Sequence, residues 1–265
     1  MNLVWVAGTR TPVTEGDWAD TAATFLGAGY RMMLPIVPDR DGPVRFHRKL
    51  AQKVALTLGA RFDPAPWQYL ATNAVPVGAV VEVIGGWPST GPPEARLDDS
   101  PPWTAIVELA PAPHDAAYRR GVTLPWASNP HSPTTGLPML SRLDEQQAGR
   151  YLRKVGATVG LWMNTTGNLS GSTAGVPLIP TGKRSWVFPD RSAGIVSNWV
   201  FWALADALSA LPQSITADVL GSTGTVAAIS GAGAVTVLTS LDDHELSPDH
   251  ERVLDLLAAR LKLLG

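Results

Sequence analysis

Two glutamates lie inside apolar stretches that are typical of β-strands. Glu82 falls within Val77–Ile84 and Glu108 within Thr104–Leu109. Two carboxylates on neighbouring strands could serve as general acid and as nucleophile or base, as glycoside hydrolysis requires. In each stretch, however, strand alternation directs the glutamate to the face opposite its apolar neighbours. The pattern therefore favours solvent-facing glutamates that do not share a cavity.

A run of small and polar residues at 164–175 could hold a nucleophile or cradle a phosphate. Its Gly167–Gly175 segment contains Ser170 and Ser172, and Lys183 and Arg184 follow closely. The run has neither the G-x-S-x-G pattern nor a P-loop lysine. A serine nucleophile also needs a nearby base, and nothing in the sequence brings His114 or His131 to it. We therefore expect a loop of turns here.

An acidic segment near the C-terminus is the only candidate metal site in the sequence. It could supply oxygen and nitrogen ligands to a divalent ion, but its spacing is not that of an EF-hand. It consists of Asp242, Asp243, His244, Glu245, Asp249 and His250. A solvated turn before a helix explains it. The chain has no cysteine, which excludes thiol catalysis, cysteine-ligated metals and disulfides.

The fourth candidate is a polar stripe on an otherwise apolar helix predicted at Ile195–Leu211. Asn198, Trp202 and Asp206 follow one another at helical spacing, while Val200, Leu204 and Leu208 are expected to be buried. If the stripe faced a pocket, Asp206 would be a desolvated carboxylate with a shifted pKa. If it faced water, it would be the outer edge of a core helix. We favour water.

Composition narrows the possible partners. The 265 residues have a formal net charge of -2, a pI near 6.2 and 17% charged residues. These values give no electrostatic reason to bind nucleic acid or a membrane surface. The first residues lack the pattern of a signal peptide, and the helix at 195–211 is short for a membrane span. The location is left open as cytoplasmic or within a particle.

Periodicity and end signals predict further elements. Strands are expected at 3–7, 30–37, 155–163, 185–188, 215–220, 225–230 and 234–240, the last two as a hairpin around Gly231–Gly233. Helices are expected at 17–26, 43–58, 143–154 and 247–264. The helix at 43–58 would bury Phe46, Leu50, Val54 and Leu58. Its polar face is basic, with Arg45, Arg48, Lys49 and Lys53, and suits either solvent or an acidic partner.

The interval Pro88–Pro138 contains eleven prolines interleaved with tryptophans and aliphatic residues. Proline disfavours long regular elements, while the apolar side chains argue against a solvated linker. We predict ordered loops that pack on the chain itself or on neighbouring subunits.

The expected fold is mixed α/β or α+β, in one domain spanning 1–265. It combines the mostly buried helix 195–211, short strands, a C-terminal β-hairpin and a terminal helix. No catalytic, cofactor or metal residues and no cofactor are assigned. The leading functional hypothesis is a non-enzymatic structural or assembly subunit of a viral, phage-like or other large particle. It would contact protein subunits through the Pro/Trp-rich loops and the basic helix 43–58. Alternatives are a soluble hydrolase or a small-molecule or protein-binding module.

Overall fold

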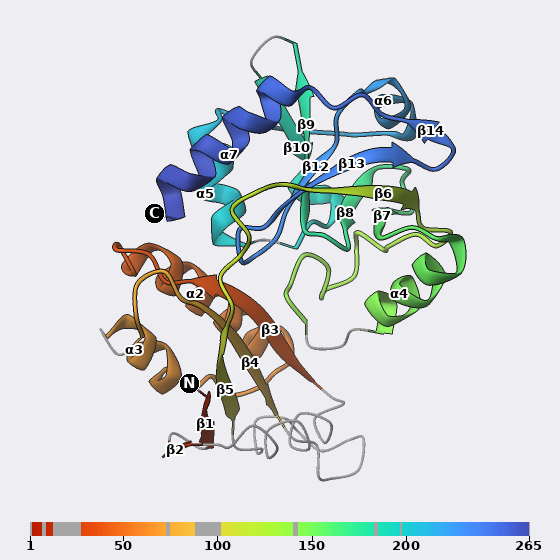
Figure 1. The fold of residues 1–265 in the computed structure, drawn as a ribbon. Helices are drawn as coiled ribbons and strands as arrows, with labels where there is room; N and C mark the ends of the chain where they lie inside the picture. The colour runs from red at the N-terminus through yellow and green to blue at the C-terminus, as the bar shows by residue number, and fades with distance from the viewer. Residues whose placement is uncertain are drawn as a thin grey trace. The chain divides into compact units, whose positions relative to one another are not determined.

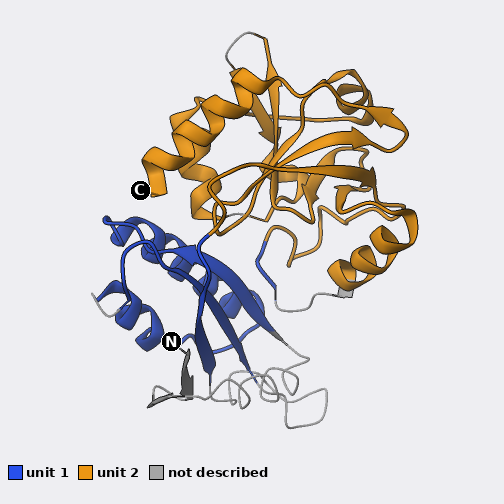
Figure 2. Ribbon diagram, viewed as in Figure 1, with its two compact units in different colours: residues 1–111, 137–142 blue, residues 112–136, 143–265 orange. Residues whose placement is uncertain are grey.

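The computed structural model describes residues 2–6, 9–12, 28–72, 75–87, 102–139, 143–182, 185–196 and 198–264. The helix expected at 17–26 and the first part of the Pro-rich interval, 88–101, lie outside these residues. The chain forms two compact units (Figure 2). Unit 1 comprises 1–111 and 137–142, and unit 2 comprises 112–136 and 143–265. The prediction of a single domain stays a prediction.

Unit 1 is built on a five-stranded antiparallel sheet with the order β2-β1-β5-β4-β3. Its strands are β1 (Asn2–Val6), β2 (Thr9–Pro12), β3 (Ala28–Pro35), β4 (Val80–Trp87) and β5 (Trp103–Leu109). Strand β3 lies at the edge of the sheet, which is where a strand tolerates a proline such as Pro35.

Two helices, α2 (Asp41–Thr57) and α3 (Ala65–Ala71), supply the rest of the unit 1 core (Figure 1). They pack with alternate residues of β3 and β4, among them Leu34 and Val83. The prediction of helix α2 is confirmed, but its buried face is rotated from the expected one. Val54 is buried as expected, and His47 and Ala51 lie beside it, whereas Phe46 and Leu50 are only partly buried. The basic side chains of α2 are exposed.

Unit 2 contains a nine-stranded mixed sheet (Figure 1). The order is β11-β10-β9-β12-β13-β6-β7-β8, with β14 paired to β13. The bounds are β6 (Ala117–Thr123), β7 (Val159–Met163), β8 (Leu169–Ser172), β9 (Val176–Thr181), β10 (Ser185–Pro189), β11 (Leu211–Gln213), β12 (Ala227–Ile229), β13 (Val235–Leu241) and β14 (His244–Glu245). The pairs β6–β7, β6–β13 and β10–β11 are parallel.

The sheet of unit 2 curls until its two ends approach each other. Leu169 N, on strand β8, donates a hydrogen bond of 2.7 Å to Ile215 O, which follows strand β11. Leu161 and Leu169 from one end share a buried cluster with Ile179 and Val187 from the other. This apolar interior fixes the curvature of the sheet.

Helices α5 (Trp199–Ala207) and α7 (His250–Leu264) cover a second core against β9, β10, β12 and β13. The remaining helices of unit 2 are α4 (Leu143–Val155) and α6 (Ala217–Ser222), with a 3₁₀ turn, η2, at Arg191–Ala193. Arg260 of α7 is buried and donates hydrogen bonds to the carbonyls of Gly233, His114 and Ala112. These hydrogen bonds link residues 112–114, at the start of unit 2, to helix α7.

Helix α5 is shorter than the predicted 195–211. The Asn198 side chain accepts a hydrogen bond of 2.7 Å from Phe201 N and begins the helix there. Ser209, with a φ of 50°, lies just past its end, and Leu211 enters a strand. The predicted burial of Val200 and Leu204 is confirmed, and Leu208 is partly buried. Val196 and Leu211 lie outside the helix and are exposed.

Four strand predictions in unit 2 need correction. Strand β6 lies within the Pro-rich interval 88–138 that was expected to form loops, because its seven residues contain no proline and pair with β7 and β13. Residues 217–222 form helix α6 instead of continuing a strand from 215, and β8 falls within the expected loop 164–175. Strand β9 was not predicted because Pro177 and Pro180 interrupt its pattern. The β12–β13 hairpin around Gly231–Gly233 is confirmed.

The fold class is confirmed as mixed α/β, with the core helix, the short strands, the C-terminal hairpin and the terminal helix all present. Among the described residues, no helix is both long and apolar enough to cross a membrane.

Candidate active site

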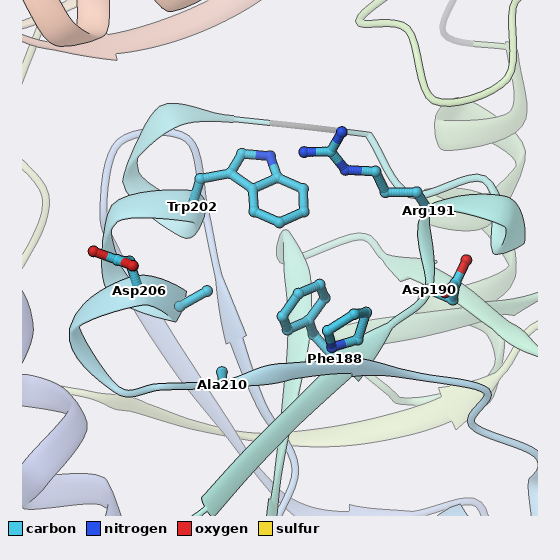
Figure 3. A pocket seen from close by; sticks show the side chains of 8 residues that line it. Phe188, Asp190, Arg191, Trp202, Asp206 and Ala210 are labelled. Carbon is cyan, nitrogen blue, oxygen red and sulfur yellow. The ribbon is translucent and has the colours of Figure 1, made fainter.

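A cavity of about 470 Å³ opens in unit 2 beside the polar stripe of α5 (Figure 3). Eight residues line it: Phe188, Asp190, Arg191, Trp202, Ala205, Asp206, Ala210 and Pro212. They come from the end of β10, from η2, from the outer face of α5 and from the turn into β11. The volume is within the range of pockets that hold small ligands.

The cavity has an aromatic wall built by local structure. The N-cap at Asn198 sets the phase of α5, so that Trp202 and Asp206, four residues apart, share one face. Phe188 at the end of β10 meets Trp202 edge-to-face, with ring centroids 5.4 Å apart and an interplanar angle of 89°. Phe188 also packs against buried Phe201, with centroids at 5.0 Å. The wall is thus anchored in the core.

Charged groups surround this wall. The Arg191 guanidinium carbon lies 4.3 Å from the centroid of the Trp202 ring. Asp190 accepts a hydrogen bond of 2.7 Å from Ser192 N, and this hydrogen bond lowers the pKa of the Asp190 carboxyl below its usual value. Figure 3 shows the carboxylates of Asp190 and Asp206 on opposite sides of the cavity, with the Phe188 and Trp202 rings between them.

One polar atom at the cavity lacks a partner. The Nε1–H of Trp202 is buried and makes no hydrogen bond to any described residue. Figure 3 shows this edge of the indole on the side of the Arg191 guanidinium. A buried donor without an acceptor carries a desolvation cost that a ligand oxygen can offset. The polar stripe therefore borders a pocket, against the sequence-based preference for water.

The glutamates proposed as a carboxylate pair lie on opposite faces of the unit 1 sheet. Glu82 is paired with Val107 and Glu108 with Val81, and adjacent residues of a strand point in opposite directions. The expectation that they share no cavity agrees with this register. The expectation that Glu82 faces solvent is wrong: it is buried and forms an ion pair with Arg31, because both faces of β4 are covered.

The two serines of the 164–175 segment make structural hydrogen bonds. Ser170 Oγ lies 2.8 Å from Ser128 Oγ and 3.0 Å from the carbonyl of Trp162. Ser172 Oγ donates to the carbonyl of Gly175 at 2.9 Å. No histidine among the described residues is hydrogen-bonded to either hydroxyl, so a serine–histidine pair is not formed there.

The acidic segment at 242–250 also has a structural role. Asp242 accepts hydrogen bonds from the backbone N–H and the hydroxyl of Thr123. Asp249 accepts from Arg252 N at the start of α7. Within the described ranges, no group of three or more histidine and carboxylate side chains could hold a metal ion.

Phe188, Asp190, Arg191 and Pro212 were not singled out from the sequence. The aromatic strand that ends at Phe188 was predicted, but nothing in the pattern shows that the next residues turn toward α5. The only signal in the sequence was the stripe on α5 itself, which contributes Trp202 and Asp206.

No protein-family model and no curated protein sequence matches the chain. Solved structures do match it over nearly its whole length. A fold IV transaminase of Curtobacterium pusillum is 17% identical, covering 100% of this chain and 99% of its own, with a TM-score of 0.76. A branched-chain aminotransferase of Thermoproteus uzoniensis with norvaline is 13% identical, covering 99% and 94%, also with a TM-score of 0.76. A hypothetical aminotransferase of Mycobacterium tuberculosis, in a PLP-bound form, is 15% identical, covering 97% and 98%, with a TM-score of 0.73.

These likenesses correct the functional hypothesis drawn from the sequence. The hypothesis of a non-enzymatic structural or assembly subunit of a large particle is wrong. Low charge and Pro/Trp-rich loops suggested subunit contacts, but they occur here on a scaffold found in enzymes. The predicted protein partners stay a prediction. Over nearly its whole length, this chain has the fold of the fold IV aminotransferases.

Proposed function

We propose that this chain is an enzyme that acts on a small molecule carrying both an amino and a carboxylate group, bound in the cavity beside α5. The observation that carries the proposal is the arrangement of opposite charges around an aromatic wall. The names of the structural neighbours support the same substrate class, since aminotransferases act on amino acids.

The carboxylate of the substrate would lie on the Arg191 side of the cavity. A guanidinium binds carboxylates through two parallel hydrogen bonds, and the unpartnered Nε1–H of Trp202 lies on the same side. The apolar body of the substrate would contact the rings of Phe188 and Trp202 together with Ala205 and Ala210.

The amino group would pair with a carboxylate. The two aspartates of the cavity outnumber its single guanidinium, so the site favours a ligand that brings positive charge. Asp190 suits ion pairing, because its lowered pKa keeps it ionised at neutral pH. The Asp206 carboxylate makes no hydrogen bond or ion pair to another described residue and is the group assigned to move a proton during the reaction.

The neighbours raise the question of pyridoxal phosphate, which one of them contains. Proteins hold this cofactor as a Schiff base with a lysine amine. The lining of the cavity includes no lysine among the described residues. Lys49, Lys53, Lys154 and Lys262 all lie exposed on helices. The described residues do not fit the cofactor in this form, and no reaction step is assigned to it.

The test is turnover of a panel of α-amino acids, other amino-carboxylates and simple amines by the purified chain, followed by mass spectrometry. We expect conversion of at least one amino-carboxylate, lost in Asp206→Asn and kept in Asp255→Asn, an exposed aspartate of α7. Conversion that persists in Asp206→Asn, or the absence of conversion across the panel, would contradict the proposal.

A further inference from the structure

We infer that this chain carries out its chemistry without holding pyridoxal phosphate as a lysine Schiff base, although it has the fold of enzymes that include a PLP-bound form. The inference rests on the positions of the four lysines that the structure describes, and is independent of the proposed substrate. The chain has five lysines: Lys49, Lys53, Lys154, Lys183 and Lys262.

A lysine that forms a Schiff base has to act as a nucleophile. Its ammonium is unreactive until burial or a neighbouring cation favours the neutral amine. Such a lysine therefore lies in a desolvated site beside the carbonyl that it attacks. The question is whether any lysine of this chain has such surroundings.

Four of the lysines occupy the solvent faces of helices. Lys49 and Lys53 are exposed one turn apart on α2, whereas the opposite face of this helix buries His47, Ala51 and Val54. Lys154 and Lys262 are exposed in the last turns of α4 and α7. A cation at the C-terminal end of a helix is favoured by the helix dipole, which accounts for these two without any catalytic role.

Lys183 lies outside the described residues, and the labelling experiment below tests it directly. Thr181 and Ser185 are paired in the β9–β10 ladder. Ser185 begins β10, while the cavity residues Asp190 and Arg191 follow the other end of the strand at Pro189. At about 3.3 Å per residue, the strand separates Ser185 from Pro189 by roughly 13 Å. Ser185, the first described residue after Lys183, therefore lies at the end of β10 remote from the cavity.

The cavity offers no substitute for the missing amine. Arg191 is its only cationic side chain among the described residues, and a guanidinium stays protonated in proteins. Asp190 and Asp206 bind or move protons but form no imine. A carbonyl compound in this cavity would thus be held by ion pairs, hydrogen bonds and aromatic contact, and would leave on dialysis.

The test is reconstitution with pyridoxal phosphate, reduction with borohydride and peptide mass spectrometry, with a fold IV transaminase as positive control. Borohydride converts a Schiff base into a stable amine, so a cofactor-bearing lysine is permanently labelled. The wild-type chain is compared with Lys183→Arg, which keeps the charge, and with Lys49→Arg as a matched exposed control.

We expect low labelling spread over several lysines, little changed in either variant, and loss of the cofactor when dialysis precedes reduction. Stoichiometric labelling of one lysine that survives dialysis would overturn the inference, and its loss in Lys183→Arg would assign it to that residue. Covalent labelling is measured without any substrate, so this test of the inference is separate from the turnover test of the proposed function.

Discussion

Units 1 and 2 place their titratable groups in different surroundings. In unit 1, burial raises the pKa of Tyr30 to about 12 and lowers the pKa of His47 to about 4. In unit 2, Asp190, Arg191 and Asp206 border a cavity, and the pKa of Asp190 is lowered mainly by a backbone hydrogen bond. The larger pKa shifts are thus found away from the cavity.

The difference lies in what surrounds each group. Tyr30 packs between Trp67 and Trp87, with ring centroids at 6.2 Å in both pairs, and Gly85 leaves room for its ring. His47 contacts Pro43 O and the ring of Phe46. These residues are core components in their neutral forms. A shifted pKa indicates a functional site only where a cavity gives a ligand access to the group.

The largest effect is expected at Asp206. Asp206→Asn removes the proton-transfer group assigned to the cavity and nearly preserves its shape. Turnover should fall by about 10²–10⁴-fold, the usual contribution of general acid–base catalysis. Steady-state kinetics measures this loss, and circular dichroism checks that the fold is kept. A wild-type rate in this variant would place the reaction outside the cavity.

The core behind the cavity should be the next most sensitive region. Leu204 is fully buried in the cluster that α5 forms with the sheet. Leu204→Ala should therefore lower the free energy of unfolding by about 2–5 kcal/mol in urea titration. Leu254→Ala, at an exposed position of α7, is the matched control and should have little effect. Equal midpoints for the two variants would contradict the assignment of α5 to the core.

In unit 1, the free energy of unfolding should depend on pH through the protonation of His47. Its pKa is about 4 in the fold and 6.5 in the unfolded chain, so the unfolded state binds more protons between these values. The stabilising contribution of neutral His47 should be complete above pH 6.5, and the free energy of unfolding should fall by roughly 3 kcal/mol as the pH drops to 4. Urea titrations at several pH values measure this loss.

The control for this prediction is a comparison of two histidines. His47→Leu should remove most of the dependence between pH 4 and 6.5, whereas replacement of the exposed His131 by alanine should leave it intact. If the free energy of unfolding of His47→Leu depended on pH as steeply as that of the wild type, another group would dominate acid unfolding.

A smaller effect is expected at Arg191. Arg191→Lys keeps the positive charge but loses the planar guanidinium that lies over Trp202. Substrate affinity should fall by about two- to fivefold, corresponding to ~0.5–1 kcal/mol for an exposed cation–π contact. Equilibrium binding measures the change. An unchanged affinity would place the substrate carboxylate elsewhere.

The sequence predicted the elements whose signals are local. Helices α2, α4 and α7 have apolar periodicity and end signals that do not depend on the rest of the fold. It was less reliable where tertiary structure overrides such signals. Strand β9 contains two prolines, and residues 217–222 form helix α6 although their apolar run resembles a strand.

The candidate site was only partly predictable for the same reason. The stripe of Asn198, Trp202 and Asp206 could be read from helical spacing, but the choice between water and a pocket depends on what lies opposite. The opposing residues, Phe188 to Arg191, come from the end of β10 and from η2, and only the tertiary structure brings them across the cavity from α5. Glu82 was misjudged similarly, since alternation cannot show that both faces of β4 are covered.

The central claim is that the α5 cavity binds a molecule through opposite charges. Calorimetric titration with a short apolar α-amino acid, its N-acetyl derivative and its carboxamide tests this most directly. We predict that the unmodified amino acid binds most tightly, that each derivative binds more weakly, and that the double variant Asp190→Asn/Arg191→Ala abolishes this difference. Equal binding of all three compounds, or unchanged binding of the amino acid by the double variant, would contradict the account.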